Sequence, residues 1–182
     1  MLYVHILKNH TNGVILKTLK MIETSFISPL GEMTICSDGE CLTGVSFGGR
    51  EIEAEERGAA PVLEQAVKWL DIYFGGGVPG FTPPIRLNVS PFCREVCEIL
   101  LSIPYGHTAT YGEIAKILAA RHGIARMSAQ AVGGAVHRNP VAVIIPCHRV
   151  IGSDGSLTGY AAGLELKAKL LELEKSVSEK RQ

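Results

Sequence analysis

Apolar and polar residues alternate over residues 23–47, and the sequences SPLGE and SDGE interrupt this alternation. A period of two is typical of strands with one buried face, and both interruptions are rich in turn-forming residues. The pattern therefore predicts three short antiparallel strands. Residues 1–20 contain two more apolar stretches on either side of HTNGV, which favours a hairpin turn. Because Met21 offers a second plausible start, we expect residues 1–20 to be an extension attached to the main fold.

Residues 61–74 (PVLEQAVKWLDIYF) carry apolar side chains at helical spacing, with a proline in the first turn and GGG directly after them. This arrangement predicts a helix that ends at the glycines. A second predicted helix begins after Ser90, a good N-cap residue, has Pro91 at its first position and ends at PYG. The stretch VPGFTPPIRLNVSP between them is rich in Pro and Gly and is predicted to be a linker.

Two shorter helices are predicted in TYGEIAKILAA and MSAQAVGGAVHRNP, on either side of a loop at residues 120–126. The pair resembles a helix-turn-helix, although the connection is longer than usual. The second helix consists mostly of Ala and Gly, which fill a core poorly. Two interpretations stay open: its backbone approaches an external partner closely, or it packs tightly against another helix of the same chain.

The segment VAVIIP predicts a buried extended stretch that leads into Cys147. After it, GLELKAKLLELEKS predicts a C-terminal helix whose leucines form an apolar side. Glu174 comes near the end of this helix, where the helix dipole disfavours a carboxylate. Glu174 is therefore either a frayed surface charge or a carboxylate held in place by a partner.

The length of 182 residues suits one large domain or two small ones. The formal net charge is zero, so overall charge predicts no polyanionic partner. The charges are unevenly distributed, however, because residues 114–153 contain five Lys or Arg residues and no Asp or Glu. This segment predicts a local basic surface of the kind that suits nucleic acid.

The chain has five cysteines, an odd number without a dense disulfide framework, which indicates a reducing compartment. Neither a signal peptide nor a membrane-spanning segment is predicted, and we expect a soluble, cytoplasmic protein. The pairs Cys36/Cys41 and Cys93/Cys97 lack the CxxC spacing of common zinc sites, so the sequence favours packing over metal binding.

The sequence IIPCHRV, residues 144–150, places a thiol directly before an imidazole and a guanidinium. A thiol near basic groups can become a nucleophilic thiolate, whereas an isolated buried thiol is a small apolar group. Neighbouring side chains of an extended segment point in opposite directions, so Cys147 and His148 would need a turn or a bridging water to exchange a proton. The imidazole would also need a carboxylate, and spacing alone leaves four candidates open. They are Asp154, Glu165, Glu172 and Glu174.

Five short motifs follow one another along the chain in an order typical of one family: YG, AVGGA, RNP, PCHRV and GY. With them, residues 90–174 as a whole resemble the catalytic domain of the O6-alkylguanine-DNA alkyltransferases, also called methylated-DNA–protein-cysteine methyltransferases. The N-terminal half is similar only loosely. The resemblance implies an α/β (α+β) fold. It comprises a ribonuclease-H-like small antiparallel sheet with a helix (residues 21–88), a helical, winged-helix-like catalytic and DNA-binding domain (90–176) and a C-terminal tail (177–182).

By this resemblance, the protein repairs DNA by moving an alkyl group from O6-alkylguanine, and from O4-alkylthymine as a further candidate, to its own Cys147. His148 would accept the thiol proton through a water, Glu174 would hold the imidazole, and Tyr111 would donate toward the guanine. The remaining implied contacts with the substrate or with the catalytic segment involve Asn139, Val150, Thr158, Tyr160 and Ala161. The thioether product has no leaving group, so each molecule would act once, without a cofactor or a metal.

The resemblance also implies that a flipped-out base is reached from the minor groove of double-stranded DNA by a monomer. The implied DNA contacts are Thr110, Arg126, Ser128, Ala129, Gln130, Ala131 and Gly133. Family members commonly have arginine at the position of Gln130, and the shorter, uncharged glutamine predicts weaker capture of the flipped base unless Arg126 helps. The alternative is a non-catalytic alkyltransferase-like protein that binds lesions, in which the cysteine is replaced; Cys147 argues against it.

Overall fold

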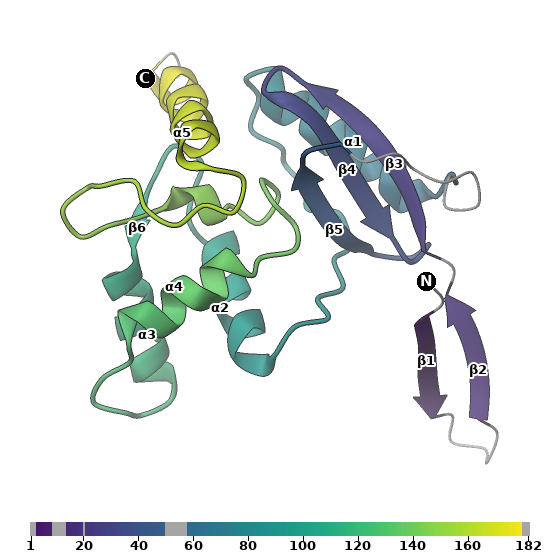
Figure 1. Cartoon of the computed structure of the whole chain (residues 1–182), viewed down its shortest axis with the longest axis horizontal. Coiled ribbons are helices and arrows are strands. Elements are labelled where there is room, and N and C mark those ends of the chain that lie inside the picture. The colour runs from purple at the N-terminus through teal and green to yellow at the C-terminus, as the bar shows by residue number, and fades with distance from the viewer. Residues whose placement is uncertain (1–2, 9–13, 20, 50–57, 180–182) are drawn as a thin grey trace.

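The computed structural model describes residues 3–8, 14–19, 21–49 and 58–179. Its N-terminal part is an antiparallel sheet of β3 (Ile22–Ser28), β4 (Gly31–Ser37) and β5 (Leu42–Phe47), in that order, with α1 (Pro61–Phe74) packed on it (Figure 1). These are the three strands and the helix that the sequence predicts. The predicted hairpin is also present as β1 (Tyr3–Lys8) and β2 (Val14–Leu19), which pair with each other in a separate two-stranded sheet. That residues 1–20 are an appendage stays a prediction.

The C-terminal part begins with α2 (Pro91–Leu101), capped by Ser90, whose Oγ accepts a hydrogen bond from the Cys93 N–H at 3.3 Å. After a short strand, β6 (Ala109–Thr110), come α3 (Tyr111–Arg121) and α4 (Ala129–His137), which pack on each other and on α2. A capping box between Thr110 and Glu113 starts α3, and the Ser128 side chain starts α4. The two predicted helices of the helix-turn-helix are therefore confirmed, with a seven-residue connection over residues 122–128.

The segment before Cys147 differs from the extended stretch that the sequence predicts. Residues 141–145 form a tight turn in which the Ile145 N–H donates to the Val141 carbonyl at 3.0 Å and Val143 has a φ of 69°. This left-handed conformation is costly for a β-branched residue, and complete burial of Val143 keeps it in place. The chain then forms the 3₁₀ turn η1 (Cys147–Arg149) and β7 (Val150–Ile151), which pairs in parallel with β6.

The C-terminal helix α5 (Leu164–Glu179) extends three residues into the tail that the sequence predicts over residues 177–182; residues 180–182 lie outside the described residues. The inward face of α5 is not the leucine stripe expected from its pattern. Leu164 is 47% exposed, whereas Lys167, Leu170 and Glu174 are completely buried. Their spacing of three and four residues is helical, but two of the three side chains carry charges, so an apolar pattern could not identify this face.

The strand β5 joins the two parts of the molecule. Its residue Val45 accepts a backbone hydrogen bond from Ala142 at 2.8 Å and donates one to Pro140 at 2.9 Å. Leu42, at the other end of β5, bonds in the same way to the linker around Ile85. The predicted linker is thus attached along a strand edge, and the segment that leads to Cys147 is held in register with the N-terminal sheet.

Candidate functional site

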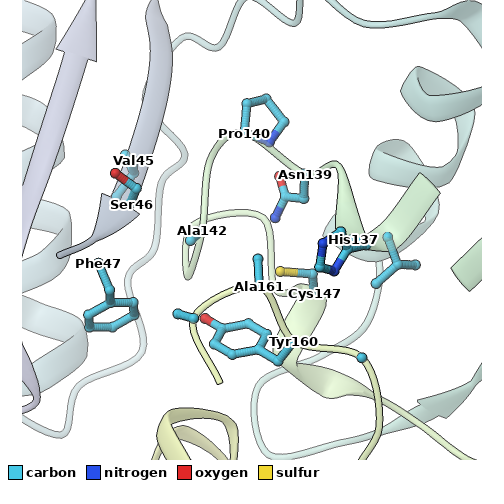
Figure 2. Close-up of a pocket in the computed structure, with 13 residues that line it drawn as sticks. Val45, Ser46, Phe47, His137, Asn139, Pro140, Ala142, Cys147, Tyr160 and Ala161 are labelled. Carbon is cyan, nitrogen blue, oxygen red and sulfur yellow. The ribbon is translucent and has the colours of Figure 1, made fainter. Parts of the chain in front are cut away.

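Cys147 lies in the first position of η1, directly after the tight turn, and is only 6% exposed. It lines a cavity of about 220 Å³ whose walls come from both parts of the chain. Figure 2 shows its sulfur pointing toward the side of the pocket where Ala142 and Ala161 lie. A small electrophile that enters this cavity can reach the thiol. Further lining residues include Asn139, Pro140, Tyr160 and Phe47.

The chain turns between Cys147 and His148, so the two residues are not neighbours on an extended strand. Because η1 is helical, the thiol borders the cavity while the imidazole enters the core, where it is completely buried. The imidazole Nδ1 has no hydrogen-bond partner among the described protein atoms, whereas Nε2 lies 2.7 Å from Oε1 of Glu174. This arrangement leaves Nδ1 as the nitrogen that can accept a proton.

Of the four carboxylates left open by the sequence, Glu174 is the one that the structure places against His148. Its two oxygens also accept hydrogen bonds from several donors besides His148. They come from Arg149 Nε at 2.9 and 3.2 Å and Arg149 Nη2 at 3.0 Å, from the Gly106 N–H at 2.9 Å and from the Tyr73 hydroxyl at 2.8 Å. So many donors explain how a carboxylate can be buried in the second half of a helix, against the helix dipole.

The charges in this cluster follow from burial and pairing. Burial alone would raise the pKa of Glu174, but the hydrogen bonds and positive charge of its partners His148 and Arg149 outweigh it and lower the pKa to about 2. Burial lowers the pKa of His148 and raises the pKa of the Cys147 thiol. In the resting protein the thiol is therefore neutral, and the basic neighbours do not by themselves produce a thiolate. Cys147 therefore needs a proton acceptor to become nucleophilic, and Nδ1 of His148, which has no partner among the described protein atoms, is the candidate.

Asn139 holds the segment that leads to the cysteine. Its Nδ2 donates to the Ile145 carbonyl at 2.9 Å, and its Oδ1 accepts from the Val141 N–H at 3.0 Å. Both ends of the tight turn are thus tied to one side chain, which also lines the pocket beside Cys147 (Figure 2).

The loop over residues 152–163 carries the other predicted substrate contacts. Tyr160 and Ala161 line the pocket, but the Tyr111 hydroxyl donates to the Thr158 carbonyl at 3.0 Å rather than pointing into the cavity. The Thr158 carbonyl and that of Val150 also accept from Lys167 Nζ, at 2.6 and 2.5 Å. The buried end of Lys167 thereby connects this loop to the strand that follows Cys147.

The predicted DNA contacts form an exposed group at the start of α4. Ser128, Ala129, Gln130 and Ala131 are all exposed, and Gly133 faces the Tyr111 ring, which lies 3.7 Å from where a Cβ would be. Arg126 is exposed as well and lines an open groove with Lys116 between α3 and α4. Thr110 is the N-cap residue of α3, directly before Tyr111.

Fewer of the basic side chains of residues 114–153 are exposed than the composition of this segment predicts. Arg149 is 7% exposed and its guanidinium contacts Glu174, so neither it nor the buried His148 belongs to an exterior basic patch. The exposed cations that remain are Lys116, Arg121, Arg126 and Arg138. Arg121 is itself 3.9 Å from Glu98.

The sequence interpretation did not identify several residues of the site, among them Tyr73, Lys167 and Arg149 as a partner of Glu174. Tyr73 comes from α1, in the N-terminal part, 101 residues before the carboxylate that it contacts. The helical period of residues 61–74 places Tyr73 on the buried face, and a buried tyrosine hydroxyl usually has a partner. The sequence could therefore indicate that the Tyr73 hydroxyl has a buried hydrogen-bond partner, but not that this partner is Glu174.

The described part of the chain contains no cluster of three His, Cys, Asp or Glu side chains suited to a metal ion. None of its helices combines the length and the apolar character that crossing a bilayer requires. Cys93 and Cys97 are buried on α2, in agreement with a packing role.

Two family models match the chain. Residues 21–87 match the model described as 6-O-methylguanine DNA methyltransferase, ribonuclease-like domain. Residues 91–176 match the model described as 6-O-methylguanine DNA methyltransferase, DNA binding domain.

Curated relatives and solved structures agree with these models. The methylated-DNA–protein-cysteine methyltransferases of Mycobacterium leprae and Methanosarcina acetivorans are each 42% identical to this chain, of which the matches cover 83%. They cover 90% and 96% of the two relatives, respectively. The O6-methylguanine methyltransferase of Mycobacterium tuberculosis superimposes with a TM-score of 0.73 at 38% identity, covering 86% of this chain and 93% of that one. The structure described as Mycobacterium tuberculosis OGT in complex with DNA superimposes with a TM-score of 0.73 at 39% identity, covering 84% of this chain and 92% of that one.

Proposed function

The chain belongs to the 6-O-methylguanine DNA methyltransferase family, and from this premise we propose how its own residues carry out the reaction. Its function is DNA repair by direct alkyl transfer to a cysteine of the protein. The observation that carries the assignment of residues is the position of Cys147, which borders a cavity on one side and precedes the buried His148–Glu174 pair on the other.

In the proposed reaction, Cys147 Sγ attacks the carbon bonded to O6 of a flipped-out guanine. The S–C bond forms as the C–O6 bond breaks, and the bonding electrons stay with O6 of the base. The thiol proton moves through a water to Nδ1 of His148, while the Nε2 proton is held by Glu174. Since the thioether that forms carries no good leaving group, each molecule transfers once.

Two further groups support this step. Tyr73 donates to the same Oε1 that contacts His148, so it fixes the carboxylate from the side of the N-terminal sheet. Tyr111 would turn its hydroxyl from the Thr158 carbonyl toward the guanine ring, to donate as negative charge develops on O6. The carbonyls of Cys147 and Val150 and the N–H of Ala161 supply the remaining contacts with the base.

On the DNA side, we propose that α4 enters the minor groove with its exposed start. Ala129 and Ala131 flank Gln130 there, and small side chains allow the backbone to approach the duplex closely. The lesion is O6-alkylguanine in double-stranded DNA, and the active form is a monomer. The five free cysteines suit a reducing, cytoplasmic environment.

Intact-mass analysis after incubation with duplex that contains O6-methylguanine tests the proposal. One methyl group per molecule should appear, on the peptide that contains IIPCHR, and Cys147→Ser should transfer none while still binding the duplex. A methyl group on Cys93 or Cys97 would contradict the assignment. A protein that binds the lesion without gaining mass would be the non-catalytic alternative, which none of the comparisons supports.

A further inference from the structure

The pocket beside Cys147 has a wall that belongs to the N-terminal sheet. Val45, Ser46 and Phe47, the last three residues of β5, line the same cavity of about 220 Å³ as the thiol. Figure 2 shows Phe47 across the pocket from Cys147, with Val45 and Ser46 next to it along the strand. The site is therefore incomplete without the first domain, although the residues assigned to the base and to its O6 all lie in the second.

This wall is held in place from two sides. Val45 is hydrogen-bonded to Pro140 and Ala142, directly before the tight turn that leads to the cysteine. Phe47 itself pairs with Met33 in the ladder between β4 and β5. Sheet pairing fixes the backbone of Phe47, so the place from which its side chain enters the pocket is set by the sheet rather than by a loop.

The space between the thiol and Phe47 is bordered by small side chains. Ala142, Ala161 and Ala162 all line the cavity, and none projects beyond its Cβ. A methyl group on O6 would remain close to Sγ, whereas a larger substituent has room to extend toward β5. Two aromatic rings border this space, from Tyr160 and the half-buried Phe47. Aromatic rings attract apolar groups, and other rings most strongly.

We propose that Phe47, at the end of β5, is a specificity-determining residue that favours O6 substituents larger than methyl, arylmethyl groups above all. The inference rests on the proposed function, because it requires that Cys147 is the acceptor. It gives the N-terminal domain a direct part in substrate choice: Cys147 of the second domain attacks the first carbon of the adduct, and Phe47 of the first domain contacts the rest together with Tyr160.

The test compares single-turnover transfer rates from O6-benzylguanine and O6-methylguanine placed in the same duplex. Phe47→Ala should lower the benzyl rate by about five- to tenfold, the effect of losing one aromatic contact, and should change the methyl rate much less. Phe47→Leu, which keeps apolar bulk, should give a smaller fall in the benzyl-to-methyl ratio. Phe81→Ala removes another half-buried phenylalanine, outside this pocket, and should leave the ratio at its wild-type value.

Thermal melting of each variant separates a fold defect from a pocket effect. An unchanged ratio in both Phe47 variants overturns the inference, as does a benzyl rate that rises in Phe47→Ala, which would make Phe47 a steric limit. Failure of the proposed function looks different, because wild-type protein would then transfer neither group to Cys147.

Discussion

The buried half of α5 and the exposed start of α4 lie in the same domain but satisfy their polar groups in opposite ways. Both carboxylate oxygens of Glu174 accept from more than one protein donor, and the donors come from three segments of the chain: α1, the loop at Gly106 and η1. Along α4, Gln130 stands between two alanines and faces solvent. The chemical step needs a geometry that the protein supplies by itself. In the proposed DNA complex, recognition needs a surface that the duplex completes, and the exposure of residues 128–131 agrees with that proposal.

Breaking the buried cluster should have the largest effect. Glu174→Gln keeps the shape of the side chain but removes the charge that orients and stabilises a protonated His148. We expect single-turnover methyl transfer to slow by about a hundredfold or more, because general-base assistance contributes that much. Duplex binding, measured by fluorescence anisotropy, should change little. Transfer at the wild-type rate would show that another carboxylate, such as Glu172, serves His148.

Tyr73→Phe is the matched, milder change in the same cluster. It removes one donor to Glu174 and leaves the ring contacts with Trp69 and Tyr105 in place. The rate should fall by about tenfold at most, the value of a single hydrogen bond. If Tyr73 positions Glu174, the pH profile of the rate should shift as well, whereas a purely structural role would change stability alone.

The pH dependence of the melting temperature in acid should reveal the contribution of Glu174 to stability. The folded pKa of Glu174 is about 2, below its ordinary value of 4.5, so the folded state binds this proton less readily than the unfolded state. The contribution of Glu174 to stability is complete above pH 4.5 and is lost as the pH falls toward 2. Between these values the melting temperature of wild-type protein should fall more steeply with decreasing pH than that of Glu174→Gln. Parallel curves would mean that the carboxylate is not ionised in the fold.

At the exposed start of α4, a substitution is expected to raise the repair rate rather than lower it. Gln130→Arg should raise the repair rate in duplex by a few-fold, because a longer planar group can fill the gap left by a flipped base. Stability should stay nearly constant, as for most surface substitutions. The gain should shrink on free O6-alkylguanine base, which needs no flipping. Equal gains from Gln130→Lys across salt concentrations would attribute the effect to charge alone.

Much of this molecule could be predicted from local signals. Ser90 and Pro91 mark the start of α2, the alternation over residues 23–47 marks the sheet, and the motif around Cys147 indicates the reactive thiol. These features depend on residues close together in sequence. The inward face of α5 could not be predicted in this way, because Lys167 and Glu174 are buried by contacts with distant segments.

The prediction of an extended segment before Cys147 was wrong for a different reason. VAVIIP has the composition of a buried strand, and burial was predicted correctly. Its path is set by Asn139, whose side chain is hydrogen-bonded to both ends of the turn. It is also set by the edge of β5, where the Val45 carbonyl accepts a hydrogen bond from the Ala142 N–H. Composition reports how apolar a segment is, whereas such tertiary hydrogen bonds decide where it bends.

The cluster around Glu174 also sets an order of events during synthesis. Translation proceeds from the N-terminus, so Tyr73, Gly106, Cys147 and His148 leave the ribosome before the carboxylate that unites them. Until α5 closes onto η1, the imidazole has no fixed orientation and the thiol has no relay to remove its proton. On the proposed mechanism, the thiol of a nascent chain without α5 therefore has no proton relay, and Cys147 becomes an acceptor only after the C-terminal helix has packed.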